Sequence, residues 1–165
     1  MIKRILVMSC ALALPLAALA DQPTVQVKPP ELQGSRPLEK QTETAVIRDY
    51  LQSWKSLRSA FDLNQPELLS PDFVGTAREK LAATIDQQAK LGIHTRYQDR
   101  THDLQIVFYS PEGLSIQMID NVGYDEQVLD HDKILATKRI ETRYVVVLTP
   151  SDVRWSVRIF QAAAK

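Results

Sequence analysis

The densest cluster of polar side chains in the sequence consists of His94, Tyr97, Asp99, His102 and Asp103. A histidine beside a carboxylate can act as a general acid or base, because its pKa lies near neutrality and the carboxylate orients the ring. The spacing matches no zinc motif, so we expect no metal and no cofactor. The same residues also fit a solvated loop between a helix and a strand, which is the commoner setting for such a cluster.

Asp120 is a second candidate, because it follows Leu114, Ile116 and Met118 at the same alternation in a predicted strand. It is therefore expected to face the core, where a carboxylate among apolar neighbours has a raised pKa and can serve as a base. Gly123 predicts a bulge, which would change the face that nearby residues occupy. A separate alternative is that Asp120 and Asn121 simply leave the sheet.

These patterns define the candidate site residues. The catalytic candidates are Asp120, Tyr124 and His102, and the ligand-binding candidates are Tyr50, Trp54 and Asp120. Trp54 and Trp155 also fit a simple packing role between a helix and the last strand. His131 lies between two aspartates in a predicted hairpin tip, so we interpret it as an exposed turn residue.

Arginines are frequent on the last two predicted strands. Alternation places Arg154, Ser156 and Arg158 on the face opposite Val153, Trp155 and Val157. With Arg139 they predict an outer polar face, which could either receive an acidic partner or simply contact solvent. The candidate partner surface is Arg139, Arg154 and Arg158.

Hydrophobic periodicity predicts two helices and then four strands. The first helix spans about 44–61 and carries an apolar stripe at spacings of three and four residues; the second spans about 71–91 and is ended by Gly92. Strands are predicted at about 103–109, 114–128, 134–148 and 153–160, and turn signals join them into an antiparallel meander. The fold class is therefore α+β, with N-terminal helices packed on a curved, cone-like antiparallel sheet.

Three segments of the sequence resemble the nuclear transport factor 2-like superfamily over about 44–160. They are the first helix with Ile47, Tyr50, Leu51 and Trp54, the segment Leu68-Leu69 to Phe73 and Gly75, and the closing hairpin through 144–157. The resemblance implies a cone enclosed by a long helix and the sheet. Some members of that superfamily are isomerases, dehydratases or polyketide cyclases, whereas others bind proteins or are assembly domains of secretion systems. The Asp-His or Asp-Tyr arrangement that is usual in the enzymes cannot be placed from these residues.

The first twenty residues predict where the protein resides. Lys3 and Arg4 precede an apolar run that ends in Ala18-Leu19-Ala20, which is typical of a signal peptide cleaved near Ala20–Asp21. A retained anchor and a lipid attached to Cys10 are the alternatives. Residues 21–43 contain several prolines and predict a flexible arm, and 44–162 predict one domain. The exported protein, periplasmic or secreted, would contain no cysteine and no transmembrane segment.

The charge and residue patterns narrow the function. The chain has 20 basic and 20 acidic residues, which gives no global field for nucleic acid. We expect an exported, non-enzymatic binding or assembly domain that recognises a protein or a small apolar ligand through its cavity or sheet face. A homodimer through the sheet is a further candidate arrangement. The alternative function is a small cone-pocket enzyme, of lyase or isomerase type, that uses Asp120 or His102 with a tyrosine.

Overall fold

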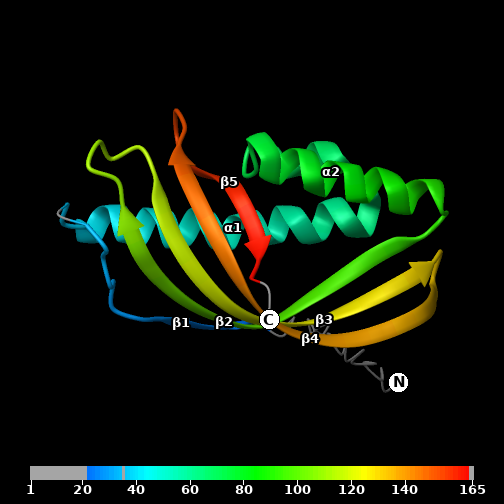
Figure 1. Cartoon of the computed structure of the whole chain (residues 1–165). Helices are drawn as coiled ribbons and strands as arrows, with labels where there is room; N and C mark the ends of the chain where they lie inside the picture. Colours follow the sequence, from blue (N-terminus) through cyan, green and yellow to red (C-terminus); the bar gives the residue numbers. More distant parts are fainter. Residues whose placement is uncertain (1–21, 35, 164–165) are drawn as a thin grey trace, which may run out of the picture.

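A long helix and a shorter one lie against one side of a strongly curved sheet (Figure 1). The computed structural model describes residues 22–34 and 36–163. The predicted signal peptide therefore lies outside the described residues. No helix in the described part of the chain is long and apolar enough to cross a membrane. The architecture is α+β, as the periodicity predicts.

The helices lie close to their predicted positions. Helix α1 spans Lys40–Leu63, a short 3-10 helix η1 spans Pro66–Leu69, and α2 spans Gly75–Lys90. Gly92 has a φ of 69°, the left-handed conformation expected of a residue that ends a helix. Gly75 also has positive φ and opens α2, so the second helix begins later than the predicted 71.

The sheet has five strands in the order β1-β2-β3-β4-β5. They are β1 Thr24–Val27, β2 His94–Tyr109, β3 Ile116–Asp130, β4 Lys133–Pro150 and β5 Trp155–Ala162. Strands β2 to β5 form the predicted antiparallel meander, whereas β1 pairs with β2 in parallel.

Part of the predicted flexible arm, Thr24–Val27, is a strand of the sheet. Thr24–Val27 pairs with 101–104 of β2, and the backbone N–H groups of Lys28, Glu31 and Gln33 donate to the β2 carbonyls of Leu104, Ile106 and Val107. The four β1 side chains are exposed. The strand is therefore held by backbone hydrogen bonds rather than by apolar burial, and a prediction from hydrophobic composition misses it.

Strand β2 begins at His94, well before the predicted 103, so the prediction of a solvated loop for 94–103 is wrong. Its register shifts between Asp99 and Thr101, opposite Gly123, so the bulge lies in β2 rather than at Gly123 itself. A Cβ on Gly123 would stand 2.8 Å from Oγ1 of Thr101, which is closer than side chains tolerate. Glycine thus permits the close approach of β2 and β3 beside the bulge.

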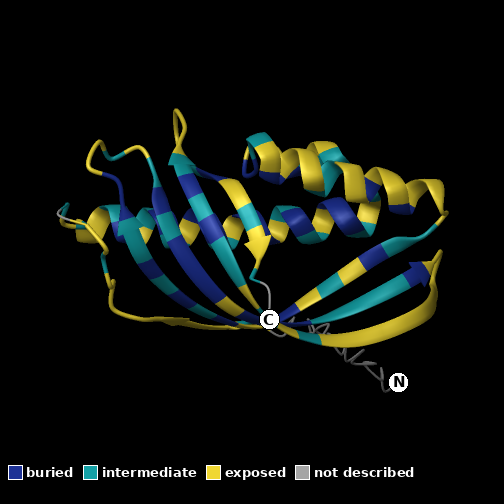
Figure 2. Ribbon diagram, viewed as in Figure 1, coloured by how far each residue is buried: buried dark blue, intermediate teal, exposed yellow. Residues whose placement is uncertain are grey.

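The core lies between α1 and the concave face of the sheet, where Figure 2 shows buried residues on both the helix and the strands. Tyr50, Trp54 and Phe61 from α1 meet Met118 and Val146 from the central strands. By contrast, β5 pairs with β4 only from Tyr144 onward, and 133–139 of β4 are exposed. The far half of the β3–β4 hairpin therefore extends away from the main core.

Candidate functional site

Three polar side chains meet inside the apolar core. Asp120 of β3 is fully buried, and its Oδ2 accepts a hydrogen bond from the Tyr50 hydroxyl at 2.7 Å. The same oxygen lies 2.8 Å from Nδ1 of His102, which is 1% exposed. Leu104 of β2 lies opposite Asp120 of β3, so the two side chains share one face of the sheet. His102 is two residues before Leu104, so alternation along β2 turns His102 to the same face, toward α1. The prediction that Asp120 faces the core is therefore confirmed.

Asp99 joins this group from the edge of β2. Its Oδ2 accepts a hydrogen bond from Nη1 of Arg58 and lies 3.8 Å from Nε2 of His102. Burial by itself lowers the pKa of His102, but the hydrogen bond to Asp120 and the nearby Asp99 carboxylate outweigh burial and raise that pKa to about 9. His102 is therefore an imidazolium at neutral pH. Burial and the nearby Asp120 charge also raise the pKa of Tyr50, which keeps its hydroxyl protonated.

Tyr124, the remaining catalytic candidate, does not hydrogen-bond to Asp120. Its ring packs at 5.9 Å from Trp54, and its hydroxyl lies 3.5 Å from that of Tyr144. Burial, the strongest influence, raises the pKa of Tyr124, so its hydroxyl is a neutral group. Tyr124 thus belongs to an aromatic layer beside the buried cluster rather than to the cluster.

Aromatic side chains fill the cone next to the buried cluster. The cavity between α1 and the sheet measures about 60 Å³, which is room for very few water molecules. Trp54 stands between this cavity and His102, with ring centroids 5.0 Å apart, and it also packs against Phe160 at 5.6 Å. Trp54 is 3% exposed. The predicted ligand-binding residues Tyr50, Trp54 and Asp120 therefore lie together, but in a packed interior.

The predicted arginine surface is not one surface. Ile159 of β5, next to Arg158, lies opposite Val147 of β4. Arg139 is eight residues before Val147, about 26 Å along an extended strand, so it is far from Arg158. The Nε of Arg139 pairs with Asp125 instead. Arg158 lies at a register shift in β5. Ser156 is buried, and its hydroxyl donates to the backbone carbonyl of Pro71, so the segment before α2 covers the face of β5 that carries Ser156. At this position the predicted polar face is therefore not an outer, solvated face.

Arg154 has a structural contact that the sequence pattern does not reveal. Its Nη1 lies 2.8 Å from Oδ1 of Asp72, a carboxylate that is 3% exposed. Asp72 Oδ2 in turn accepts a hydrogen bond from Ser56 of α1. Reversal of the charge at Arg154 would place two carboxylates together, so the arginine stabilises the domain whatever else it contacts.

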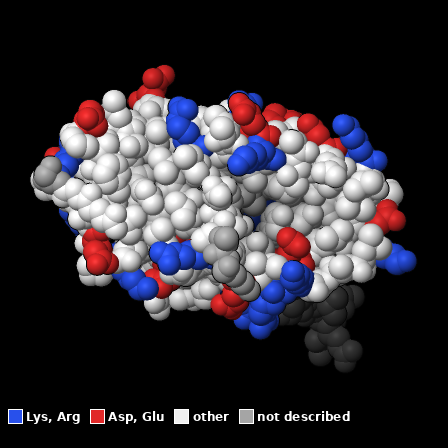
Figure 3. Space-filling view, in the orientation of Figure 1, with Lys and Arg blue, Asp and Glu red and all other residues white. Residues whose placement is uncertain are grey.

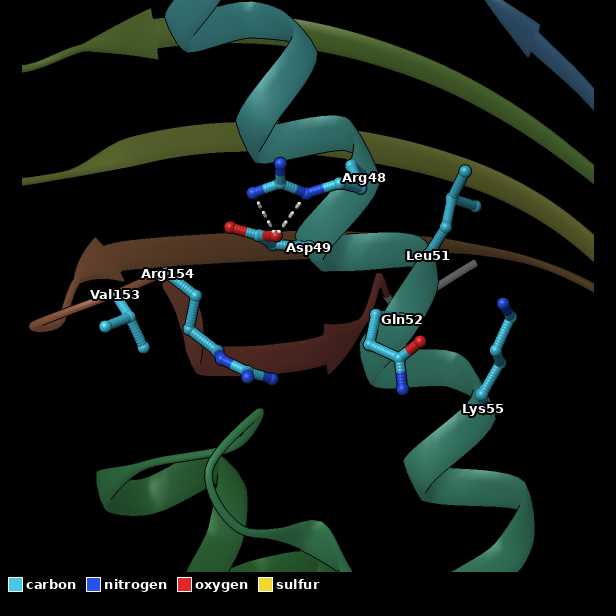
Figure 4. Close-up of a pocket in the computed structure, with 7 residues that line it drawn as sticks. All are labelled: Arg48, Asp49, Leu51, Gln52, Lys55, Val153 and Arg154. Carbon is cyan, nitrogen blue, oxygen red and sulfur yellow. Dashed lines mark hydrogen bonds and ion pairs between the residues drawn. The ribbon is translucent and has the colours of Figure 1, made fainter.

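A surface groove of about 600 Å³ runs beside α1 (Figure 4). One wall is the exposed face of α1, and the opposite wall is the loop before β5, where Val153 is 81% exposed. We call this the α1 groove; its lining residues are Arg48, Asp49, Leu51, Gln52, Lys55, Val153 and Arg154.

The α1 groove has an excess of positive charge, with three cationic side chains and one carboxylate. The carboxylate is Asp49, which is 7% exposed, binds Arg48 at 2.8 Å and accepts a hydrogen bond from the backbone N–H of Trp155. Lys55 forms no ion pair within the described part of the chain. Elsewhere, acidic and basic side chains intermingle on the face shown in Figure 3. Sequence reasoning missed Gln52, Lys55 and Val153, because only the fold brings helix and loop together.

Comparison with solved structures identifies the fold. The intermembrane space region of the chloroplast protein ARC6 superposes with a TM-score of 0.62 at 15% identity, over 79% of this chain and 100% of that one. A putative scytalone dehydratase from Novosphingobium aromaticivorans gives 0.53 at 14% identity, over 76% and 89%. A periplasmic fragment of TraM gives 0.51 at 12% identity, over 72% and 98%.

The chain therefore has a nuclear transport factor 2-like fold, as the three sequence segments predict. No protein-family model and no curated protein matches the sequence. The structural neighbours include both domains from outside the cytosol and a protein named for an enzyme. At these identities the likeness establishes the fold alone.

Proposed function

We propose that this protein is an exported, non-enzymatic binding domain whose α1 groove holds an acidic segment of a partner protein. The observation that carries the proposal is the packed cone, with its cavity of only about 60 Å³. A ligand site in a protein normally offers about 300–1,000 Å³. The α1 groove, at about 600 Å³, lies within that range, and Figure 4 shows its two walls facing each other.

Charge and exposure determine the kind of partner. Lys55 and the excess of positive charge favour carboxylates, because opposite charges across an interface speed association and fix its register. Val153 and Leu51 add apolar contact area. The partner segment is thus expected to combine Asp or Glu with a few apolar side chains. The export signal and the likeness to a periplasmic and an intermembrane domain support a location outside the cytosol.

The alternative function is a lyase or isomerase that uses His102 and Asp120. The hydrogen-bonded His102, Asp120 and Tyr50, and the dehydratase-like neighbour, favour it. Against it, Trp54 fills the space where a substrate in the cone would meet His102. We therefore assign the α1 groove to partner binding, and the hydrogen bonds of Asp120 to Tyr50 and His102 to stability.

Changing the charge at Gln52 should change affinity with a definite sign. Gln52 is exposed within the groove, and Gln, Glu and Lys all have good helix propensity, so the fold should be retained. We expect Gln52→Glu to weaken binding of a short fluorescent peptide rich in Glu and Leu by about fivefold, and Gln52→Lys to strengthen it by a similar factor. Fluorescence anisotropy measures both affinities.

The controls separate this groove from general charge effects. Leu135→Glu and Leu135→Lys make the same charge changes on the distant β3–β4 hairpin, where Leu135 is 51% exposed. They should alter the affinity by less than twofold, and a peptide rich in Gln and Leu should bind more weakly than the acidic one. Equal effects at Gln52 and Leu135 would contradict the assignment of the groove.

A further inference from the structure

A second hollow, distinct from the α1 groove, reaches the buried cluster from the side. It measures about 190 Å³ and lies between α1, the edge of β2 and the segment that leads into β1. We call it the lateral crevice; its deep end is formed by His102 and Asp99. The side chains of Leu51 and Val25 form an apolar part of its wall, and Lys55 and Arg58 are its cationic side chains.

Two buried polar atoms at the deep end find no hydrogen-bond partner among the described residues. They are Nε2 of His102 and Oδ1 of Asp99, on side chains that are 1% and 2% exposed. Nδ1 of His102 is already bound to Asp120, and Oδ2 of Asp99 is bound to Arg58. Because unpaired buried polar atoms are costly, these two atoms favour a ligand group that can bridge them.

The required chemistry of that group follows from the two atoms. His102 is an imidazolium at neutral pH, so Nε2 carries a hydrogen to donate, whereas Asp99 can only accept. A ligand carboxylate would be repelled by Asp99, and an ammonium would be repelled by His102. A ligand hydroxyl can accept a hydrogen bond from Nε2 of His102 and donate one to Oδ1 of Asp99, so it satisfies both atoms.

The outer part of the crevice adds a second requirement. Lys55 forms no ion pair within the described residues, and Arg58 uses Nη1 for Asp99. Cations at the rim favour an anion, and Leu51 with Val25 favours a short carbon chain between the two ends. The volume corresponds to about six water molecules, which is the size of a small metabolite.

We propose that the lateral crevice binds a small hydroxycarboxylic acid, with its hydroxyl between His102 and Asp99 and its carboxylate at Lys55. This inference does not depend on the partner proposed for the α1 groove. Lys55 borders both hollows, whereas Gln52 and Val153 border only the groove and His102 only the crevice. Failure of one proposal can therefore be distinguished from failure of the other.

Three matched compounds test the chemistry on the unaltered protein, purified after expression of the full chain. 3-Hydroxybutyrate contains both groups, butyrate lacks the hydroxyl, and 1,3-butanediol lacks the carboxylate. Isothermal titration calorimetry should show the strongest binding for 3-hydroxybutyrate and at least tenfold weaker binding for each of the others, since a site with buried polar atoms rejects an analogue that leaves them unpaired. Equal binding of 3-hydroxybutyrate and butyrate, or no binding of any of the three, would overturn the proposal.

A variant then locates the site. Lys55→Met keeps the helix and removes the rim cation, so 3-hydroxybutyrate should bind about tenfold more weakly while 1,3-butanediol is unaffected. Lys133→Met is the matched control on the distant β3–β4 hairpin and should change neither affinity. NMR shifts of the His102 ring on addition of 3-hydroxybutyrate provide an independent readout. A ring signal that does not move despite binding would place the compound elsewhere and overturn the assignment.

Discussion

Replacing Asp120 by alanine should lower the free energy of unfolding by about 3–5 kcal/mol at neutral pH, because it leaves a buried cation without its partner. The alanine would strand the charged ring of His102 and the Tyr50 hydroxyl in the core, since Oδ2 of Asp120 is bound to both. Asp120→Asn keeps the volume and one acceptor oxygen, so we expect a smaller loss of about 1–3 kcal/mol.

Equilibrium unfolding in urea measures these losses. Tyr50→Phe removes only one hydrogen bond to Asp120 and should cost about 1 kcal/mol. Asp130→Ala, at the exposed β3–β4 hairpin tip, is the control and should remain within about 0.5 kcal/mol of the unaltered protein. A stability loss below about 1 kcal/mol for Asp120→Ala would show that the cluster is not a stabilising element.

Stability should also fall as the pH rises through about 9. The folded pKa of His102, about 9, lies above its unfolded value of 6.5, so the folded state holds the proton more tightly. That preference stabilises the fold fully below pH 6.5, and the contribution is lost as the pH rises through 9. It amounts to about 3 kcal/mol, because each pKa unit corresponds to about 1.4 kcal/mol.

The ionisable groups around His102 come from three elements of the fold. Asp120 comes from β3, Asp99 from β2 and Tyr50 from α1, with Arg58 bound to Asp99. Other residues titrate above pH 9 as well, so the informative quantity is the stability difference between the unaltered protein and His102→Gln. We expect this difference to shrink by about 3 kcal/mol between pH 6 and pH 10. A difference that stays constant with pH would contradict the raised pKa.

The sequence predicts the elements better than it predicts the surfaces. Strong periodicity identifies the helices and β3 to β5, and alternation alone turns Asp120 toward the core. It does not detect β1, because a short strand held by backbone hydrogen bonds leaves no apolar pattern. The predicted start of β2 is also too late, because residues 94–103 are largely polar although His102 is buried.

The sites depend on contacts between residues far apart in the chain. Tyr50 and Asp120 are separated by 70 positions, yet their hydrogen bond defines the buried cluster. The α1 groove requires the loop at Val153 to face α1, although about 100 positions separate the loop from that helix. Periodicity gives the face of one element but not its partner, so these surfaces emerge only from the fold.

The most direct test of the proposed function is to trap the partner in the cells that export the protein. A photoreactive amino acid is placed at Val153 in the α1 groove or at Leu135 on the opposite hairpin, both of which are well exposed. We expect a discrete cross-linked product from Val153 alone, with an Asp- or Glu-rich segment at the linked site and less product in Gln52→Glu. Cross-linking that is equal at the two positions, or a basic linked segment, would contradict the account.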